Sequence, residues 1–185
     1  MESSLADLVH PWHDFYLLVG TASATLVGLM FVAATIGAQV FTERNREAMR
    51  AFISPTVVHF SAVLFICMAA AIPSQTWLMS GVLLFVGGGA GVIYAARVWV
   101  QLFLRHSFTV DVVDRLFYAL FPVIGYLLVM GSAVLLLEQS RWSLEALAAA
   151  LITLLFAGIR NAWDMTMWIV IRVPVPAPEK DVPSS

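Results

Sequence analysis

The side chains best suited to chemistry stand close together near the end of the sequence, at Arg160, Asn161 and Asp164. In a helix, Arg160 and Asp164 share one face and can form an ion pair, because residues four apart are neighbours. Arginine before aspartate is the less favourable order, so a partner on another helix is an equally good expectation. The segment predicts a lock between helices or, alternatively, a binding site for a ligand, an ion or an anionic lipid. A third interpretation is that Arg160 extends toward the cytoplasm.

Further polar side chains lie inside otherwise apolar stretches and are expected at the same depth. Arg160 lies about 24 Å along its stretch when counted from Leu144, well past the middle of a hydrocarbon core about 30 Å thick. The other members of this expected polar layer are Gln39, His59, Arg97, Gln101 and Tyr118. Ionisable groups in hydrocarbon are costly and usually face protein or water, so these eight residues form the candidate binding or polar cluster.

Catalytic residues are not predicted, because no Ser-His-Asp, Cys-His or paired-carboxylate set converges at one depth. The acid–base candidates are His59, Tyr118 and Asp164, so enzyme activity stays open as the less favoured interpretation. The single cysteine, Cys67, excludes an internal disulfide. The segment 10–14 (HPWHD) carries two histidines and an aspartate but lacks a fourth ligand, so we predict no metal site and no cofactor.

The composition predicts an integral membrane protein. Of 185 residues, 61% are apolar and 12% are charged, about half the charged share typical of soluble domains. A soluble domain of this size cannot bury so much apolar surface, so the lipid bilayer is the expected surrounding. The formal net charge is −2, which gives no basic excess for binding nucleic acid. The predicted fold class is therefore an all-α, polytopic membrane helical bundle.

Five apolar stretches are long enough to cross a bilayer as helices, which takes about 20 residues each. They cover residues 15–41, 52–72, 77–104, 116–137 and 144–171. Their continuous Ala- and Leu-rich composition indicates helices rather than the short alternating strands of a barrel. We predict one five-helix transmembrane domain at 1–172, followed by a disordered, proline-rich cytoplasmic tail at 173–185.

The distribution of lysine and arginine predicts the orientation. Seven basic residues lie on the side that holds the links 42–51 and 105–115 and the tail, against Arg141 alone on the other side. The positive-inside rule then places the N-terminus outside and the C-terminus in the cytoplasm of a plasma or inner membrane. Tryptophan agrees with this, because three stand at predicted outer ends and three near predicted inner ends.

Small residues predict where helices approach one another. Gly20, Ala24 and Gly28 form a small-xxx-small series in the first span, for which helix packing is the main interpretation and a hydroxyl-lined path the alternative. The run 87–91 (GGGAG) in the third span either weakens that helix or lets a neighbour touch it. In the fourth span, Pro122 and Gly125 are expected to kink the helix.

The fifth span has two different sides. Small residues share the side of Arg160, and the opposite side carries large aliphatic residues that are expected to face lipid. The latter are Leu147, Leu151, Leu155, Ile159 and Ile169. The chain is thus expected to present one small, polar side of this helix to its neighbours.

Two functions fit these patterns. The first is a small, non-catalytic multi-pass protein that assembles with itself or with a partner membrane protein and presents the polar layer to the cytoplasm, where its arginines suit anionic lipid headgroups. The alternative is a channel or small transporter with a path lined by the first and fifth spans. Against the alternative, the outer half of the chain carries no charge, and five spans do not divide into equal repeats.

Overall fold

The structure is a computed structural model that describes residues 5–38, 46–72, 76–104, 118 and 120–172. Three predicted features lie outside these residues: Gln39 of the polar layer, the link 105–115 and the tail 173–185. Gln101 lies within a described helix, but its side chain is outside the description.

Every described element is a helix, which confirms the all-helical prediction. The order along the chain is α1 (Leu5–Val9), η1 (His10–Trp12), α2 (His13–Ala38), α3 (Arg46–Ala70), α4 (Trp77–Leu104), α6 (Phe121–Leu137) and α7 (Ser143–Arg172). Three helical stretches are long and apolar enough to cross a membrane, namely His10–Ile36, Trp77–Val100 and Ser143–Met167. Because a helix satisfies its own backbone hydrogen bonds, such stretches suit a hydrocarbon environment, and they indicate a membrane protein.

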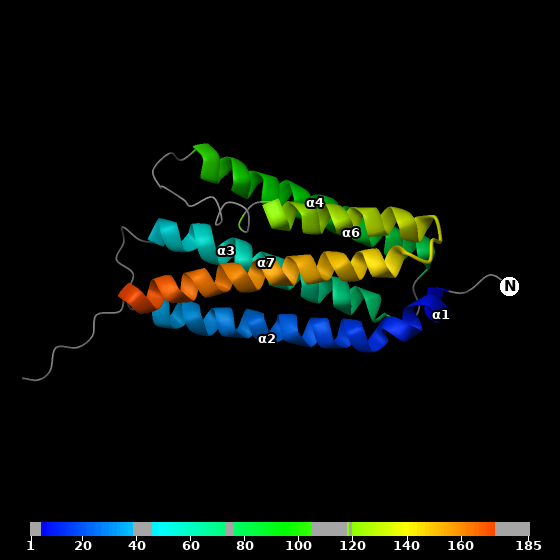
Figure 1. The fold of residues 1–185 in the computed structure, drawn as a ribbon, viewed down its shortest axis with the longest axis horizontal. Coiled ribbons are helices and arrows are strands. Elements are labelled where there is room, and N and C mark those ends of the chain that lie inside the picture. The colour runs from blue at the N-terminus through cyan, green and yellow to red at the C-terminus, as the bar shows by residue number, and fades with distance from the viewer. Residues whose placement is uncertain (1–4, 39–45, 73–75, 105–117, 119, 173–185) are drawn as a thin grey trace, which may run out of the picture.

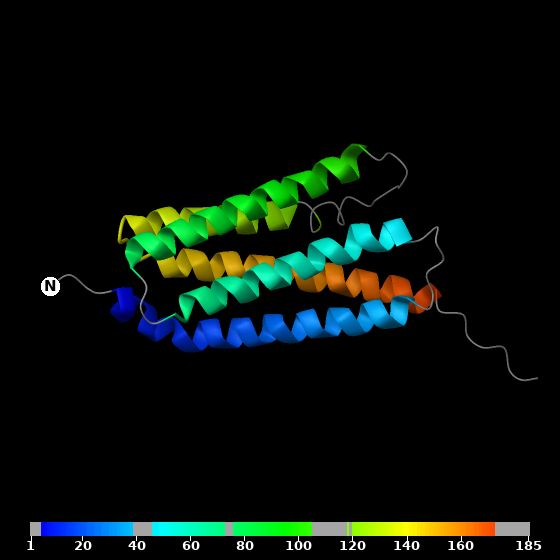
Figure 2. The same ribbon diagram turned by 180° about the vertical axis from the view of Figure 1, so that it is seen from behind.

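The five long helices run alternately up and down in one bundle, with α2 and α4 at opposite edges (Figures 1 and 2). The helix α7 lies between them and packs against α3 and α6, while α2 packs mainly on α3 and α4 mainly on α6. The helices α3 and α4, although consecutive, touch each other only lightly. We call the end of the bundle that holds α1 the α1 end, and the opposite end the far end.

The central position of α7 overturns part of the expected lipid-facing side. Leu147 and Leu151 are 2% and 0% exposed, because α3 and α6 cover this side of α7. The exposed side is instead formed by Ile152, Phe156 and Ile159, so the expectation holds for Ile159 and is wrong for Leu147 and Leu151. The physical reason is that lipid and packed side chains are equally apolar, so hydrophobicity alone does not separate the two sides.

A seam of glycines lets α4 and α6 lie against each other. A β-carbon added on this seam would overlap a side chain of α6, at Gly81 against Leu137, at Gly88 against Met130 and at Gly91 against the Tyr126 ring. By contrast, Gly87 and Gly89 face open space. The helix continues unbroken from Trp77 to Leu104, so the glycine run serves close approach rather than interrupting the helix.

The helix α6 is shorter than the predicted fourth span. It begins at Phe121, with Pro122 in its first turn, where a proline lacks no hydrogen bond that the helix would otherwise make. Pro122 therefore starts the α-helix and does not kink its interior, which corrects the expectation. Just before it, residues 118 and 120 lie in a π-helical turn.

Candidate functional site

The first polar link of the bundle joins α3 to α6 through His59. The buried imidazole Nδ1 of His59 lies 2.9 Å from the hydroxyl of Tyr126, which is also buried. The ring of Tyr94, on α4, meets the imidazole edge-on with centroids 6.3 Å apart. Three helices thus meet at one histidine, and the hydrogen bond offsets part of the desolvation free energy of burying two polar groups.

A second link joins α7 to the turn that precedes α6. The Tyr118 hydroxyl donates a hydrogen bond of 3.2 Å to the backbone carbonyl of Asn161. Tyr118 is 7% exposed and Asn161 is fully buried, so this contact lies inside the bundle. The sequence placed both residues in one polar layer, and here they do meet.

A third interaction stays within α7, where Arg160 forms an ion pair with Asp164 across one helical turn. The two side chains are 33% and 27% exposed, so the pair lies at the edge of the packed side of α7. The sequence was compatible with a pairing of Arg160 and Asp164 within their own helix or with partners on another helix, and the structure has the pairing within α7. The packed side itself is occupied by Asn161.

The remaining described member of the predicted layer stands apart. Arg97 is exposed on the outer side of α4, away from the glycine seam that faces α6. The structure therefore brings five of the eight predicted residues into hydrogen bonds or ion pairs, as a set of separate links. Those five are His59, Tyr118, Arg160, Asn161 and Asp164.

Two residues of these links were missed from the sequence. Tyr126 is the partner of His59, and Ser23, on α2, donates a 2.7 Å hydrogen bond to the backbone carbonyl of Phe60 on α3. A tyrosine in the middle of an apolar span is a usable signal, because a buried tyrosine hydroxyl usually has a hydrogen-bond partner. Ser23 carries no such signal, since a serine in a span can bond to its own helix.

The polar links suit the holding together of helices. They connect α2 with α3, α3 with α6, and α7 with the turn before α6. Within the described residues, no group of three or more His, Cys, Asp or Glu side chains is placed to hold a metal ion. The segment 10–14 therefore has no such group around it in the described part of the chain.

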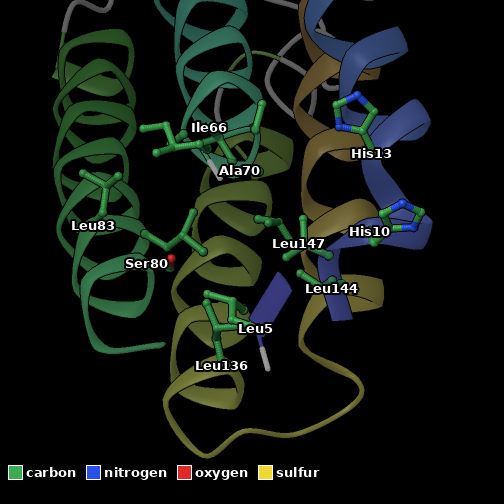
Figure 3. Close-up of a pocket in the computed structure, with 15 residues that line it drawn as sticks. Leu5, His10, His13, Ile66, Ala70, Ser80, Leu83, Leu136, Leu144 and Leu147 are labelled. Carbon is green, nitrogen blue, oxygen red and sulfur yellow. The ribbon is translucent and has the colours of Figure 1, made fainter. Parts of the chain in front are cut away.

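A pocket of about 270 Å³ opens at the α1 end of the bundle (Figure 3). Its walls come from the last turns of α3, the first turns of α4 and α7, and the end of α6, and α1 contributes Leu5. Figure 3 shows Ser80 and Leu83 on one side and the imidazoles of His10 and His13 on the other. The lining is otherwise aliphatic, so this pocket suits an apolar ligand, in contrast to the polar links.

The small-residue side of α2 does not pack inside the bundle as we expected. Gly20 does, since its α-carbon faces Cys67 on α3, but Ala24 and Gly28 are exposed. Exposed threonines lie on the same side of α2, and two of them bond to their own helix: Thr25 to the Thr21 carbonyl and Thr35 to the Phe31 carbonyl, each at 2.9 Å. A hydroxyl satisfied in this way has less to offer a permeating solute.

No protein-family model, no curated protein and no solved structure matches this chain.

Proposed function

We propose that this protein is a non-catalytic, five-span protein of the plasma or inner membrane that assembles with a second copy of itself through the exposed side of α2. In this arrangement the α1 end lies outside the cell and the far end faces the cytoplasm. The basic residues on the links and tail support this orientation, since seven of them belong to the far side and one to the other.

The two shorter apolar helices are proposed to cross the membrane beside the three long ones. The stretch Phe121–Leu137 has 17 residues, and at 1.5 Å per residue it measures about 25 Å. A bilayer about 30 Å thick adapts to a short span by local thinning, at modest cost. The antiparallel packing of α6 between α4 and α7 supports a crossing, because both neighbours are long enough to span.

The observation that carries the assembly proposal is the outward side of α2. Thr21, Gly28 and Thr35 repeat every seven residues and therefore share one side of the helix. All three are exposed, as are Ala24 and Thr25 beside them. In a membrane, small residues let two helix backbones approach closely, whereas lipid alone favours no such stripe.

The far end of the bundle is proposed to meet anionic lipid headgroups. Arg160 retains a third of its exposure beside Asp164, and Arg97 is exposed on α4. Arginines at the cytoplasmic surface attract anionic headgroups. This contact would orient the assembled bundle against the cytoplasmic leaflet without any chemical step.

The alternative of a channel or transporter path between the first and fifth spans has weaker support. The threonines that would line this path do not face one common space, because Thr21 and Thr25 on α2 are exposed and point away from the bundle. Thr153, on α7, bonds to the Ala149 carbonyl of its own helix at 2.8 Å. A path lined by these two helices would need them to face each other, and α2 packs mainly on α3.

Replacing Gly28 with isoleucine tests the assembly. The added side chain would hold two α2 helices apart, so the dissociation constant of the dimer should rise at least about tenfold, equal to about 1.4 kcal/mol. Sedimentation equilibrium or native mass spectrometry in mild detergent measures this constant. The matched control is Gly87→Ile on α4, because Gly87 also faces open space but lies outside the α2 stripe.

The control variant should dimerise as the wild type does. A wild-type protein that stays monomeric at every concentration would contradict the proposal. A monomer that also conducts ions in liposomes would favour the channel alternative.

A further inference from the structure

The pocket at the α1 end is built differently from the rest of the bundle. We propose that it binds one acyl chain of a phospholipid from the outer leaflet, with the headgroup held beside His10 and His13. The site rests on the five-span orientation proposed above, which puts the α1 end in the outer leaflet, and it does not depend on self-assembly.

The lining selects an apolar occupant. Three of the fifteen lining side chains are polar, namely His10, His13 and Ser80, and the others are alanine, valine, leucine or isoleucine. A buried water needs two to four polar partners, and a cavity walled by aliphatic side chains stays dry. In a bilayer the nearest apolar material is the hydrocarbon of the lipids.

The volume fits a segment of a single chain. At about 270 Å³, the pocket is smaller than the pockets of about 300–1,000 Å³ that enclose drug-sized ligands. It is less than twice the size of a cavity of about 150 Å³ that holds one benzene molecule. A space of this size accommodates part of one acyl chain.

The depth of the pocket also matches the outer leaflet. On α3 the lining residues run from Ile66 to Ile72, six residues apart, which is about 9 Å along the helix. One leaflet of hydrocarbon is about 15 Å deep, half of the core. A chain in the pocket would therefore sit at the depth where lipid chains already lie, and its entry would need no transfer through water.

The polarity of the pocket follows that of a phospholipid. His10 and His13 are exposed and flank Trp12, a residue type that prefers the membrane–water interface. An imidazole N–H can donate a hydrogen bond to a phosphate or ester oxygen. The rest of the lining is aliphatic, and Figure 3 shows the histidines on one side of the pocket, with Ile66 and Leu83 across from them, so the polar and apolar parts of a lipid each meet a matching surface.

The fold leaves this space between its own helices. The helices α3 and α4 contact each other far less than they contact their other neighbours, so their side chains do not close the gap between them. The small residues Ala69 and Ala70 on α3 and Ser80 on α4 line it. Figure 3 shows Leu5 of α1 beside Leu136 of α6 at the α1 end of the pocket.

Filling the pocket tests the proposal. Ala70→Phe places a ring in the space, and the matched control Ala90→Phe places the same ring on an exposed position of α4 that does not line the pocket. Each full-length protein is purified in detergent, mixed with dipalmitoyl phosphatidylglycerol, and examined by native mass spectrometry. Wild type and control should retain one lipid per chain, and Ala70→Phe should retain at least tenfold less.

Thermal unfolding separates lipid loss from misfolding. Added phosphatidylglycerol should raise the melting temperature of the wild type and of Ala90→Phe, because a ligand that binds the folded state stabilises it. The melting temperature of folded Ala70→Phe should stay constant on addition of lipid. Should that variant fail to fold, His10→Ala combined with His13→Ala provides the second test, with an expected several-fold loss of phosphatidylglycerol retention.

Three outcomes would overturn the lipid site. Equal retention by Ala70→Phe and Ala90→Phe would mean that the lipid merely surrounds the bundle. Retention of palmitate but not of the phospholipid would exclude a headgroup contact. Displacement of the bound phospholipid by detergent at the same molar ratio to protein would exclude selectivity for the lipid. None of these outcomes affects the dimerisation constant, so self-assembly would stand or fall separately.

Discussion

The two edge helices of the bundle use the same kind of residue in opposite directions. On α4, Gly88 and Gly91 face inward and let α6 lie close. On α2, Gly28 and its threonine neighbours face outward, where the described chain places nothing within 4 Å of an added β-carbon. Both helices also expose large apolar residues, such as Leu29 and Val32 on α2 and Val86 and Ile93 on α4.

A stripe of small residues does not by itself reveal which helix packs against it. On α4 the partner is within the chain, and its presence explains why glycine is required there. On α2 the same pattern remains uncovered, and a second copy would supply the missing surface. The contrast can be tested separately on each helix, because the α4 glycines face α6, whereas Gly28 on α2 faces open space.

The largest effect is expected from Gly91→Ala on α4. A methyl group there would overlap the Tyr126 ring, and overpacking of this kind costs up to about 3 kcal/mol, occasionally more. Gly87→Ala is the control, because its methyl group meets open space and should stabilise the helix by up to about 1 kcal/mol. Reversible unfolding in mixed micelles measures both. Equal stability of the two variants would refute the glycine seam.

A smaller effect is expected from removing the hydroxyl of Tyr126, whose ring lies against Gly91. Tyr126→Phe removes the partner of His59 and leaves a buried imidazole nitrogen unsatisfied, at a cost of about 2 kcal/mol. Tyr16→Phe, on the packed side of α2, is the matched control. The Tyr16 hydroxyl is buried without a hydrogen-bond partner in the described part of the chain, so its removal should leave stability equal or higher. A similar loss in both variants would argue against the His59 link.

The smallest effect is expected from Thr25→Val on the outward side of α2. The threonine hydroxyl bonds to its own helix, and the valine side chain has the same shape, so the free energy of unfolding of the monomer should change by less than about 0.5 kcal/mol. Chemical denaturation of the monomeric Gly28→Ile background measures this. A loss above 1.5 kcal/mol would show that the outward side already takes part in the fold of a single chain.

The sequence predicted the kind of fold better than it predicted which side of each helix packs against the others. Apolar runs of helix length, with Trp77 and Trp142 near their ends, were sufficient to predict a helical membrane protein. The sides of α7 could not be predicted in the same way, because Leu147 and Leu151 would be equally stable against lipid or against α3 and α6. Hydrophobic burial distinguishes inside from outside in water, and this distinction vanishes in hydrocarbon.

The polar layer was predictable in part for a related reason. Burying Tyr118, Asn161 and His59 is costly, so their presence in apolar spans predicted that they contact other polar groups. The identity of each partner depended on which helices are neighbours. Tyr126 became the partner of His59 because α6 packs on α4 and α7, an arrangement that brings Tyr126 to α3 and that residue spacing along one helix does not encode.

The central place of α7 has a consequence for how the chain is made. The pairs α2–α3 and α4–α6 lie earlier along the chain and pack largely within themselves, and α3 hardly touches α4. In the proposed five-span arrangement, these two pairs would enter the membrane during synthesis before the helix that lies between them. Their facing surfaces would then be solvated by lipid until α7 arrives, and the insertion of α7 is the step at which two separate hairpins become one body.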